Sequence, residues 1–342
     1  MAALGGKPPN HAEPATLNRM SSRLPLALLA PLALAGAPVA HAATLDFSAS
    51  YPLGARAGVS DLRLLGGAVG AGLSTRGADL SYARGLALPP LGAASAELRA
   101  ALAWSGGVRL GATATGTAGP VALNLGLAGW TTAATTLDPL AAWTLAPADL
   151  HARGLSADLG ARYRLSRALV ATADGHLGAQ PQLVLGVENR RDLTRTLPPT
   201  EGDDPAAPPE TETTGTLTLR GGVRTGQEVL GLTAGVAYAT PAGTVLALDA
   251  QAGPARGGRR GLGLVASVTA PDLLGEGSRV QAYAAYEPWR LTAAPLRLGA
   301  QASLPLGPGT ATLDLSGGRD PAGVAGFGVR VGYQFPLGGS GE

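Results

Sequence analysis

Few side chains in this sequence could carry out chemistry, and their spacing favours a hydrogen-bonded pair over a catalytic site. The chain has 342 residues, no cysteine and four histidines, which leaves no thiolate nucleophile and no zinc-binding spacing. Asp174 and His176 are two residues apart, so in a strand they share one face, where the carboxylate could orient the imidazole as a general base. No Gly-x-Ser-x-Gly motif supplies a nucleophile. We therefore expect a structural pair here, and no catalytic residue, cofactor or metal.

Two further stretches have compositions that could suit a ligand site, but neither has the required pattern. The glycine-rich stretch 66–72 is not followed by Gly-Lys-Ser or Gly-Lys-Thr, so a phosphate-binding loop is not expected. The stretch 191–215 is rich in proline and carboxylates but poor in apolar residues. We interpret it as a disordered acidic surface loop rather than a cation site, because nothing fixes the geometry of its carboxylates.

The N-terminal region predicts export. Residues 1–19 have no evident role, and we interpret them as an extension from a start site placed too early. Met20 then begins a segment in which Arg23 precedes a nearly unbroken apolar stretch, 24–39, followed by Ala40-His41-Ala42. This is the pattern of a signal peptide over 20–42, and three prolines within it argue against a membrane-spanning helix.

The charge of the exported chain gives no reason to expect a nucleic-acid partner. The sequence has 26 basic and 24 acidic residues; removing 1–42 takes away three basic residues and one acidic residue, leaving 23 of each. The mature chain is therefore close to neutral, and it has no basic cluster interleaved with aromatic residues.

From residue 43 to residue 335 the dominant pattern is an alternation of apolar and polar residues with a period of two. In 154–165 the apolar residues are Leu155, Ala157, Leu159, Ala161, Tyr163 and Leu165, and the polar ones are Ser156, Asp158, Arg162 and Arg164. Segments 44–51 and 295–304 are similar, and a weaker, glycine-rich one spans 59–73. We count seventeen candidate strands and, since bacterial barrels have an even number, expect about sixteen, with a range of 14 to 18.

Charged residues fall almost entirely on the polar face of these strands. A charge that faces lipid at mid-depth costs roughly 2–4 kcal/mol, so a membrane barrel must exclude charges from its outer face. A soluble β-sandwich would also alternate. The residues that we predict to face the interior, as candidates for lining a pore, are Arg99, Arg109, Asp158, Arg162, Arg164, Asp174, His176, Arg220, Asp249, Arg297, Asp314 and Arg330.

Large aromatic residues distinguish the barrel from the sandwich. They lie near the ends of the candidate strands, where a membrane barrel has its interfacial girdles, whereas a sandwich core would place them mid-strand. The set is Tyr51, Trp104, Trp130, Tyr163, Tyr238, Tyr286, Trp289, Phe327, Tyr333 and Phe335. The positions therefore favour an all-β, antiparallel transmembrane barrel over 43–335.

The last strand, 326–335, resembles the C-terminal signal strand of bacterial outer-membrane β-barrel proteins. It alternates Phe327, Val329, Val331, Tyr333 and Phe335 with small or polar residues, and a short tail, 336–342, follows it. The resemblance implies that Tyr333 and Phe335 are recognised by the barrel assembly machinery, and that this strand closes the barrel against 44–51.

These expectations define a function. We predict an exported outer-membrane barrel in contact with lipid, no enzyme, and a passive, weakly selective channel for small polar solutes, since barrels of 16 to 18 strands leave an aqueous interior. The alternative is an exported surface or adhesion protein, either a blocked barrel or a soluble sandwich. Assembly into a homo-oligomer stays open.

The end of the barrel at which 191–215 lies has two conflicting indications. Counting strands back from the last one places it at the end with the chain termini. Long loops of such barrels lie at the opposite end, and we prefer this expectation from loop length.

Overall fold

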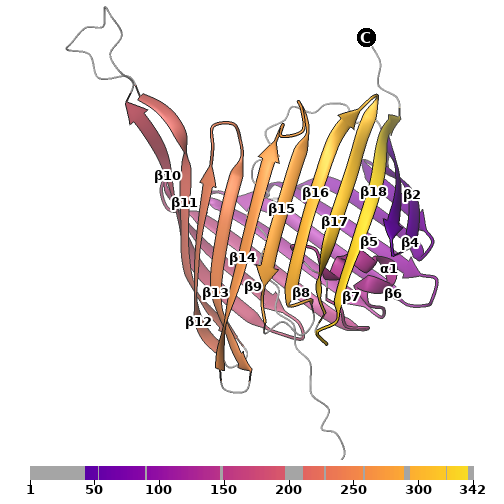
Figure 1. Cartoon of the computed structure of the whole chain (residues 1–342), viewed down its shortest axis with the longest axis horizontal. Coiled ribbons are helices and arrows are strands. Elements are labelled where there is room, and N and C mark those ends of the chain that lie inside the picture. The colour runs from indigo at the N-terminus through magenta and orange to yellow at the C-terminus, as the bar shows by residue number, and fades with distance from the viewer. Residues whose placement is uncertain are drawn as a thin grey trace, which may run out of the picture.

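The chain folds into one closed β-barrel. The computed structural model describes residues 43–52, 54–88, 91–146, 149–196, 211–226, 229–256, 259–288, 293–320 and 322–337. Within them, eighteen antiparallel strands each pair with the next along the chain, and the first, β1 (Ala43–Tyr51), also pairs with the last, β18 (Ala325–Leu337) (Figure 1). The predicted antiparallel barrel is therefore confirmed, and the soluble sandwich is wrong because a sandwich has two sheets with edges.

The remaining strands follow in order around the barrel. They are β2 (Gly54–Leu64), β3 (Gly67–Ser74), β4 (Gly77–Leu88), β5 (Leu91–Ala103), β6 (Val108–Ala118), β7 (Val121–Trp130), β8 (Gly154–Arg164), β9 (Leu169–Leu177), β10 (Gln182–Thr196), β11 (Thr211–Gly226), β12 (Val229–Ala239), β13 (Val245–Arg256), β14 (Arg259–Pro271), β15 (Arg279–Tyr286), β16 (Leu296–Leu306) and β17 (Gly309–Arg319). Two short helices, α1 (Ala134–Leu137) and η1 (Pro139–Ala142), lie between β7 and β8. No helix in the described ranges is long and apolar enough to cross a membrane.

The strand that sequence analysis missed lies in the weak segment 59–73. The structure divides this segment between β2 and β3 at a two-residue turn, Leu65-Gly66, in which both residues have positive φ. Such turns suit a hairpin but favour Asn-Gly or Asp-Gly, so a leucine there gives no turn signal. A bulge at Asp61, where the register shifts between Val59 and Leu62, also interrupts the alternation. The total is thus eighteen rather than about sixteen.

The acidic stretch 191–215 was partly misassigned. Residues 191–196 end β10 and 211–215 begin β11, and these two strands extend beyond the rim of the barrel (Figure 1). Residues 197–210 lie outside the described residues. Because the strands reverse direction one after another from β1, the β10–β11 connection is at the same end as Ala43 and Leu337. Strand counting was right, and the expectation from loop length was wrong.

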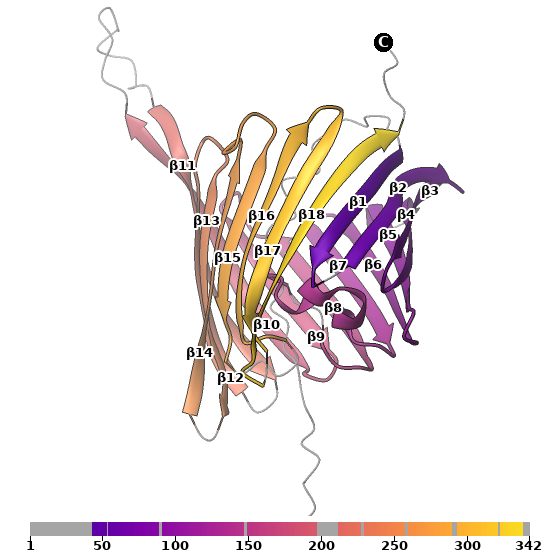
Figure 2. The ribbon, with the colours of Figure 1, turned by 45° about the vertical axis from the view of Figure 1, so that its right-hand side comes forward.

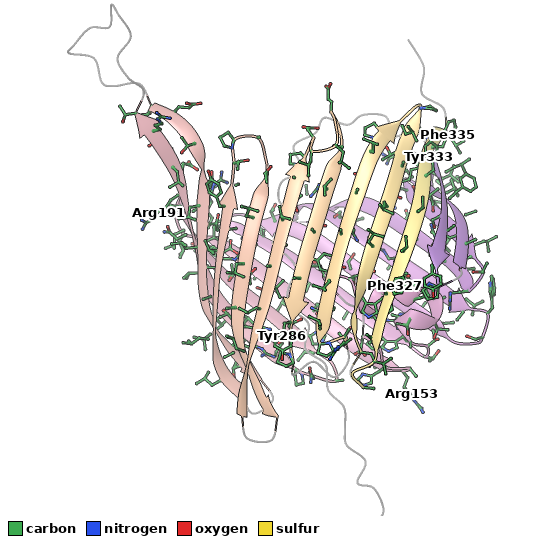
Figure 3. All side chains as sticks on the ribbon, in the orientation of Figure 1. Arg153, Arg191, Tyr286, Phe327, Tyr333 and Phe335 are labelled. Atoms are coloured by element: carbon green, nitrogen blue, oxygen red, sulfur yellow. The ribbon has the colours of Figure 1, made fainter. Side chains whose placement is uncertain are left out.

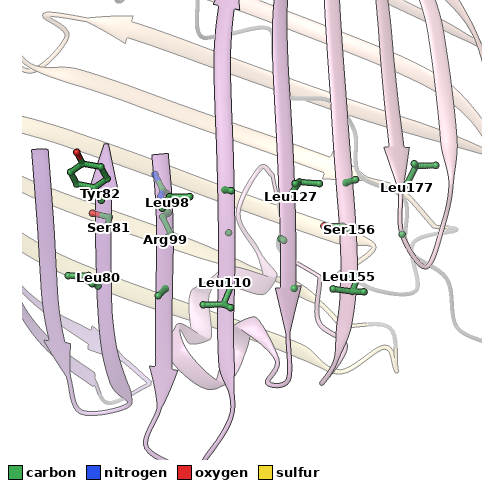
Figure 4. Close-up of a pocket in the computed structure, with 17 residues that line it drawn as sticks. Leu80, Ser81, Tyr82, Leu98, Arg99, Leu110, Leu127, Leu155, Ser156 and Leu177 are labelled. Atoms are coloured by element: carbon green, nitrogen blue, oxygen red, sulfur yellow. The ribbon is translucent and has the colours of Figure 1, made fainter. Parts of the chain in front are cut away.

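The alternation of each strand gives the barrel an apolar outer face and a polar inner face. Leucines such as Leu159, which is 51% exposed, project outward, and the apolar concavity over β4–β9 in Figure 4 is lined by leucines of this face. The register keeps the two sets apart around the sheet: Leu159 is opposite Leu125 and Gly175, and Arg162 is opposite Ala122 and Thr172. The outer face therefore stays continuous across strands that are distant in sequence.

Aromatic residues gather near both rims of the outer face, with one exception to the prediction. Tyr333 and Phe335 lie near one rim, and Tyr286 and Phe327 near the other (Figure 3). Trp130 instead faces inward, because its register partner Arg109 does so, and the guanidinium lies 4.9 Å from the Trp130 ring centroid. The expectation that Trp130 belongs to an outer girdle is wrong, and Trp289 lies outside the described residues.

The last strand closes the sheet as predicted. Phe335 is opposite Leu45 and Tyr333 is opposite Phe47, so the seam joins apolar residues on the outer face. The strand continues through Pro336 and Leu337, two residues beyond its expected end. The proposed signal peptide and the extension before it, 1–42, together with 338–342, lie outside the described residues.

The seam can be tested by a disulfide in this cysteine-free chain. Register partners in an antiparallel pair are about 4.5–5.5 Å apart between Cα atoms, within the range of a disulfide. We expect Ala49→Cys with Val331→Cys, which are opposite each other across the seam, to crosslink on oxidation, measured by mobility on a non-reducing gel. Leu313→Cys with Val331→Cys, which are opposite each other on β17 and β18, is the control. A crosslink in the control but not in the seam pair would mean that the barrel is open.

Candidate functional site

A segment of the chain folds into the barrel and occupies part of its interior (Figure 2). This inward segment, 131–146, leaves β7 at the end opposite the chain termini and contains α1 and η1. η1 begins after Asp138, whose carboxylate accepts a hydrogen bond of 3.0 Å from the backbone N–H of Leu140, with Pro139 at the first helical position. Leu140 is completely buried. The helix thus carries an apolar contact into an otherwise polar interior.

Polar and apolar contacts hold the inward segment against the wall formed by β15–β18. The Arg330 guanidinium forms an ion pair with the Asp138 carboxylate, and the Tyr283 hydroxyl donates a hydrogen bond of 2.8 Å to the Trp143 carbonyl. Leu140 approaches the wall at Gly328, where a Cβ would lie 2.8 Å from its Cδ1 atom. Only glycine permits this approach. The position of the segment therefore depends on both the ion pair and a glycine.

Two cavities border the inward segment. One of about 380 Å³ lies between the segment and the wall of β1–β5, β17 and β18, and its lining includes Asp46, Arg56, Asp79, Asp138 and Arg330. The other, of about 180 Å³, lies against β8–β14 and is bounded by Leu145 of the segment. The interior is thus narrowed by the segment, with a cavity on two sides of it.

Six of the inward arginines are neutralised by carboxylates of the same strand, of nearby strands or of connections between strands. The pairs are Arg56 with Asp46 and Asp79, Arg99 with Glu97, Arg162 with Glu188, Arg220 with Asp249, Arg297 with Glu287, and Arg330 with Asp138. Opposite charges this close cancel at a distance, so they leave only a weak net field in the interior. Among the described residues, no group of three or more His, Asp or Glu side chains is placed to hold a metal ion.

The register places all twelve predicted interior residues on the inward face, but it groups only some of them. Arg162, Asp174, Arg220 and Asp249 line the smaller cavity. Asp314 and Arg330 are register partners beside the larger one. The other members of the set are dispersed along the wall: Arg99 and Arg109 on β5 and β6, Asp158, Arg164 and His176 on β8 and β9, and Arg297 on β16.

The expected pair of Asp174 and His176 does not form. His176 Nδ1 lies 2.7 Å from the carboxylate of Asp158, its register partner on β8. Two residues along one strand are farther apart than register partners on adjacent strands, so the cross-strand carboxylate is the closer partner. His176 is also only 5% exposed, and a solute in the lumen would not reach its imidazole. The other described histidine, His151, has its Nδ1 atom 2.9 Å from a carboxylate oxygen of Asp149.

Arg297 is the predicted interior residue that faces no open space. Its guanidinium forms an ion pair with Glu287, and both side chains are fully buried. Its second Nη donates a hydrogen bond of 2.7 Å to the Ala294 carbonyl, and Gln251 donates one of 3.3 Å to Glu287. Removing one partner of a buried pair costs about 3–5 kcal/mol, because a charge is left unpaired. Arg297 therefore acts as an anchor for the start of β16.

Sequence analysis missed the residues of the inward segment. Leu140, Trp143 and Leu145 lie in a connection that has no alternating pattern, so the pattern gave no reason to place it inside the barrel. The composition of this connection could have indicated that it is buried, because a connection with several large apolar residues tends to bury them. Its direction, into the barrel, could not be read from the sequence because the partner glycine, Gly328, is almost two hundred residues away.

Comparisons with known proteins find similar barrels at low similarity. No protein-family model and no curated protein matches the chain. Among solved structures, OccK1 (OpdK) of Pseudomonas aeruginosa is 11% identical with a TM-score of 0.44, and the match covers 86% of this chain and 96% of that chain. OccK10 (OpdN) of the same organism is 12% identical with a TM-score of 0.44, covering 87% and 99%. A triple mutant of the Rhodopseudomonas blastica porin is 10% identical with a TM-score of 0.42, covering 86% and 99%.

Releasing the inward segment should widen the path through the barrel. We expect Asp138→Ala to remove both the ion pair to Arg330 and the cap of η1, and to increase the conductance of the barrel in planar bilayers. A pair this exposed contributes about 0.2–1 kcal/mol and a cap about 1 kcal/mol, so the barrel should still assemble. Asp192→Ala, at the exposed end of β10, is the control. Unchanged conductance in Asp138→Ala would show that the segment does not limit passage.

Proposed function

We propose that this chain is a passive outer-membrane channel for small polar solutes. The observation that carries the proposal is a closed eighteen-stranded barrel with an apolar outside and a charged, hydrogen-bonding inside. Barrels of this size have interiors wider than their side chains can fill. The inward segment narrows this interior and leaves cavities on two sides of it, both lined in part by charged side chains. A pathway with these properties suits solutes of small size rather than macromolecules.

The pairing of charges supports weak selectivity. A channel that strongly selects one sign of ion has an excess of the opposite charge around its narrowest part. Around the larger cavity, Asp46, Asp79 and Asp138 lie with Arg56 and Arg330, and Arg76 also lines it. Three carboxylates and three guanidiniums at this place give no strong preference. Selection there would depend mainly on size.

Export, membrane insertion and assembly form part of the same proposal. The apolar outer face, with aromatic residues near both rims, would face lipid, and 20–42 would direct export as a signal peptide. Tyr333 and Phe335, at the rim next to the chain termini (Figure 3), would be the residues that the assembly machinery recognises. The barrel would then close when this strand meets β1.

The assembly role can be separated from simple lipid exposure. Phe335→Asp should strongly lower the amount of assembled, heat-modifiable barrel in the outer membrane, because it changes the recognised strand end. Phe327→Asp is the matched control, since Phe327 also projects outward but near the opposite rim. Deleting 338–342 should matter little. If the two substitutions reduce assembly equally, the loss reflects only a charge on the apolar face, and the signal role is contradicted.

The channel itself is tested by reconstituting the refolded barrel. We expect discrete conductance steps in planar bilayers, a reversal potential close to zero in a KCl gradient because the interior charges are paired, and liposome swelling in arabinose that declines for larger sugars. Protein that has not refolded, identified by its gel migration, is the control. Absence of conductance and swelling from a folded barrel would favour the alternative, an exported surface protein whose lumen is blocked.

A further inference from the structure

The smaller cavity is a built pocket in the wall rather than a gap between loops. Its lining comes from seven successive strands, β8–β14, and from Leu145 of the inward segment. Inward-facing glycines make room for it: at Gly235 a Cβ would lie 2.8 Å from Arg220 Nε, so the Arg220–Asp249 pair lies flat over the backbone. With a volume of about 180 Å³, the pocket holds several waters or one small solute.

The charged groups of this pocket leave one carboxylate uncompensated. Arg162 forms an ion pair with Glu188, and Arg220 contacts both carboxylate oxygens of Asp249, at 2.7 and 2.9 Å. Asp174, the third carboxylate of the lining, forms no hydrogen bond or ion pair within the described residues. Three carboxylates and two guanidiniums leave a formal charge of −1. Because both guanidiniums are already engaged, the pocket suits a cation better than an anion.

The rest of the lining indicates the kind of cation. Val184, Val245, Val265 and Leu145 contribute apolar surface, and Thr172 and Thr233 contribute hydroxyl groups. A divalent metal ion requires several oxygen ligands to replace its water, and the described residues contain no group of three or more His, Asp or Glu side chains that could hold one. A primary ammonium needs only a few acceptors, and a short alkyl body would cover the valines. An organic monocation therefore matches the lining better than a metal ion.

We propose that this pocket binds small organic monocations, with Asp174 as the carboxylate that accepts the ammonium group and the valine surface as the contact for the alkyl body. The inference rests on the proposed channel function and deepens it, because it names the class of solute that the pathway retains. Binding must be weak enough for release if the solute is to pass. The channel would then pass many small solutes but hold alkylammonium ions longer than neutral ones.

Calorimetry on the refolded barrel in detergent tests this directly, with n-butylammonium chloride as the probe. We expect saturable binding of n-butylammonium, and none of sodium butyrate or 1-butanol, which have the same body without the positive charge. Asp174→Asn should weaken binding by about tenfold or more, the usual effect of losing a hydrogen bond to a charged group. Glu97→Gln, which removes an inward carboxylate on β5 outside the pocket, should leave binding unchanged.

A second variant keeps the test decisive if Asp174→Asn does not fold. Leu145→Trp leaves the carboxylate in place but fills the pocket from the inward segment, so it should also reduce binding of the probe. No binding by the wild-type barrel, equal binding of butyrate, or unchanged binding in the pocket variants would overturn the proposal. Swelling assays with neutral sugars separate it from the channel function: permeation without butylammonium binding rejects only this site, and binding without permeation rejects only the channel.

Discussion

The structure depends on one constraint, which is that every strand of the sheet must have a hydrogen-bonded partner on both sides. An unpaired backbone group in an apolar medium costs several kcal/mol, so the first and last strands must meet, as β1 and β18 do. With an even number of strands, closure brings both chain ends to one rim. It also makes the side-chain alternation continuous around the barrel, because register partners always share a face. The inner and outer faces are therefore properties of the whole sheet.

Closure also creates an interior volume that the inward side chains of the strands cannot fill. Two arrangements of the chain occupy or preserve this volume. The inward segment brings Leu140 and Trp143 into the interior and rests on glycines of β17 and β18. Along β8–β14, glycines instead allow long side chains to lie flat on the wall, as Arg220 does over Gly235. The absence of a Cβ atom at glycine thus has opposite results in the two regions. On β17 and β18 it lets the inward segment pack against the wall, and along β8–β14 it leaves room for the pocket.

Whether a feature of this barrel could be predicted from the sequence depends on how far apart in the sequence the interacting residues are. The alternation of apolar and polar residues is local, as in 154–165, and it predicted most strands and their two faces, while the aromatic residues of 326–335 predicted the closing strand. The turn at Leu65-Gly66 was missed because leucine in a left-handed conformation is unusual. The direction of the inward segment was missed because it depends on the distant residues Arg330 and Gly328. A single sequence reveals which face a residue occupies, but not what lies across the lumen.

The histidine pair illustrates this limit and explains where the pocket's charge comes from. Along the sequence, Asp174 is the natural partner for His176. The register of β8 against β9 places Asp158 opposite the imidazole and Gly160 opposite Asp174, so the histidine takes the first carboxylate and the second is left to face the cavity. A shift of two residues would preserve both faces of the barrel, but it would no longer place Asp158 opposite His176. The uncompensated charge is therefore set by strand register, and the interior chemistry of this barrel is decided across strands rather than along them.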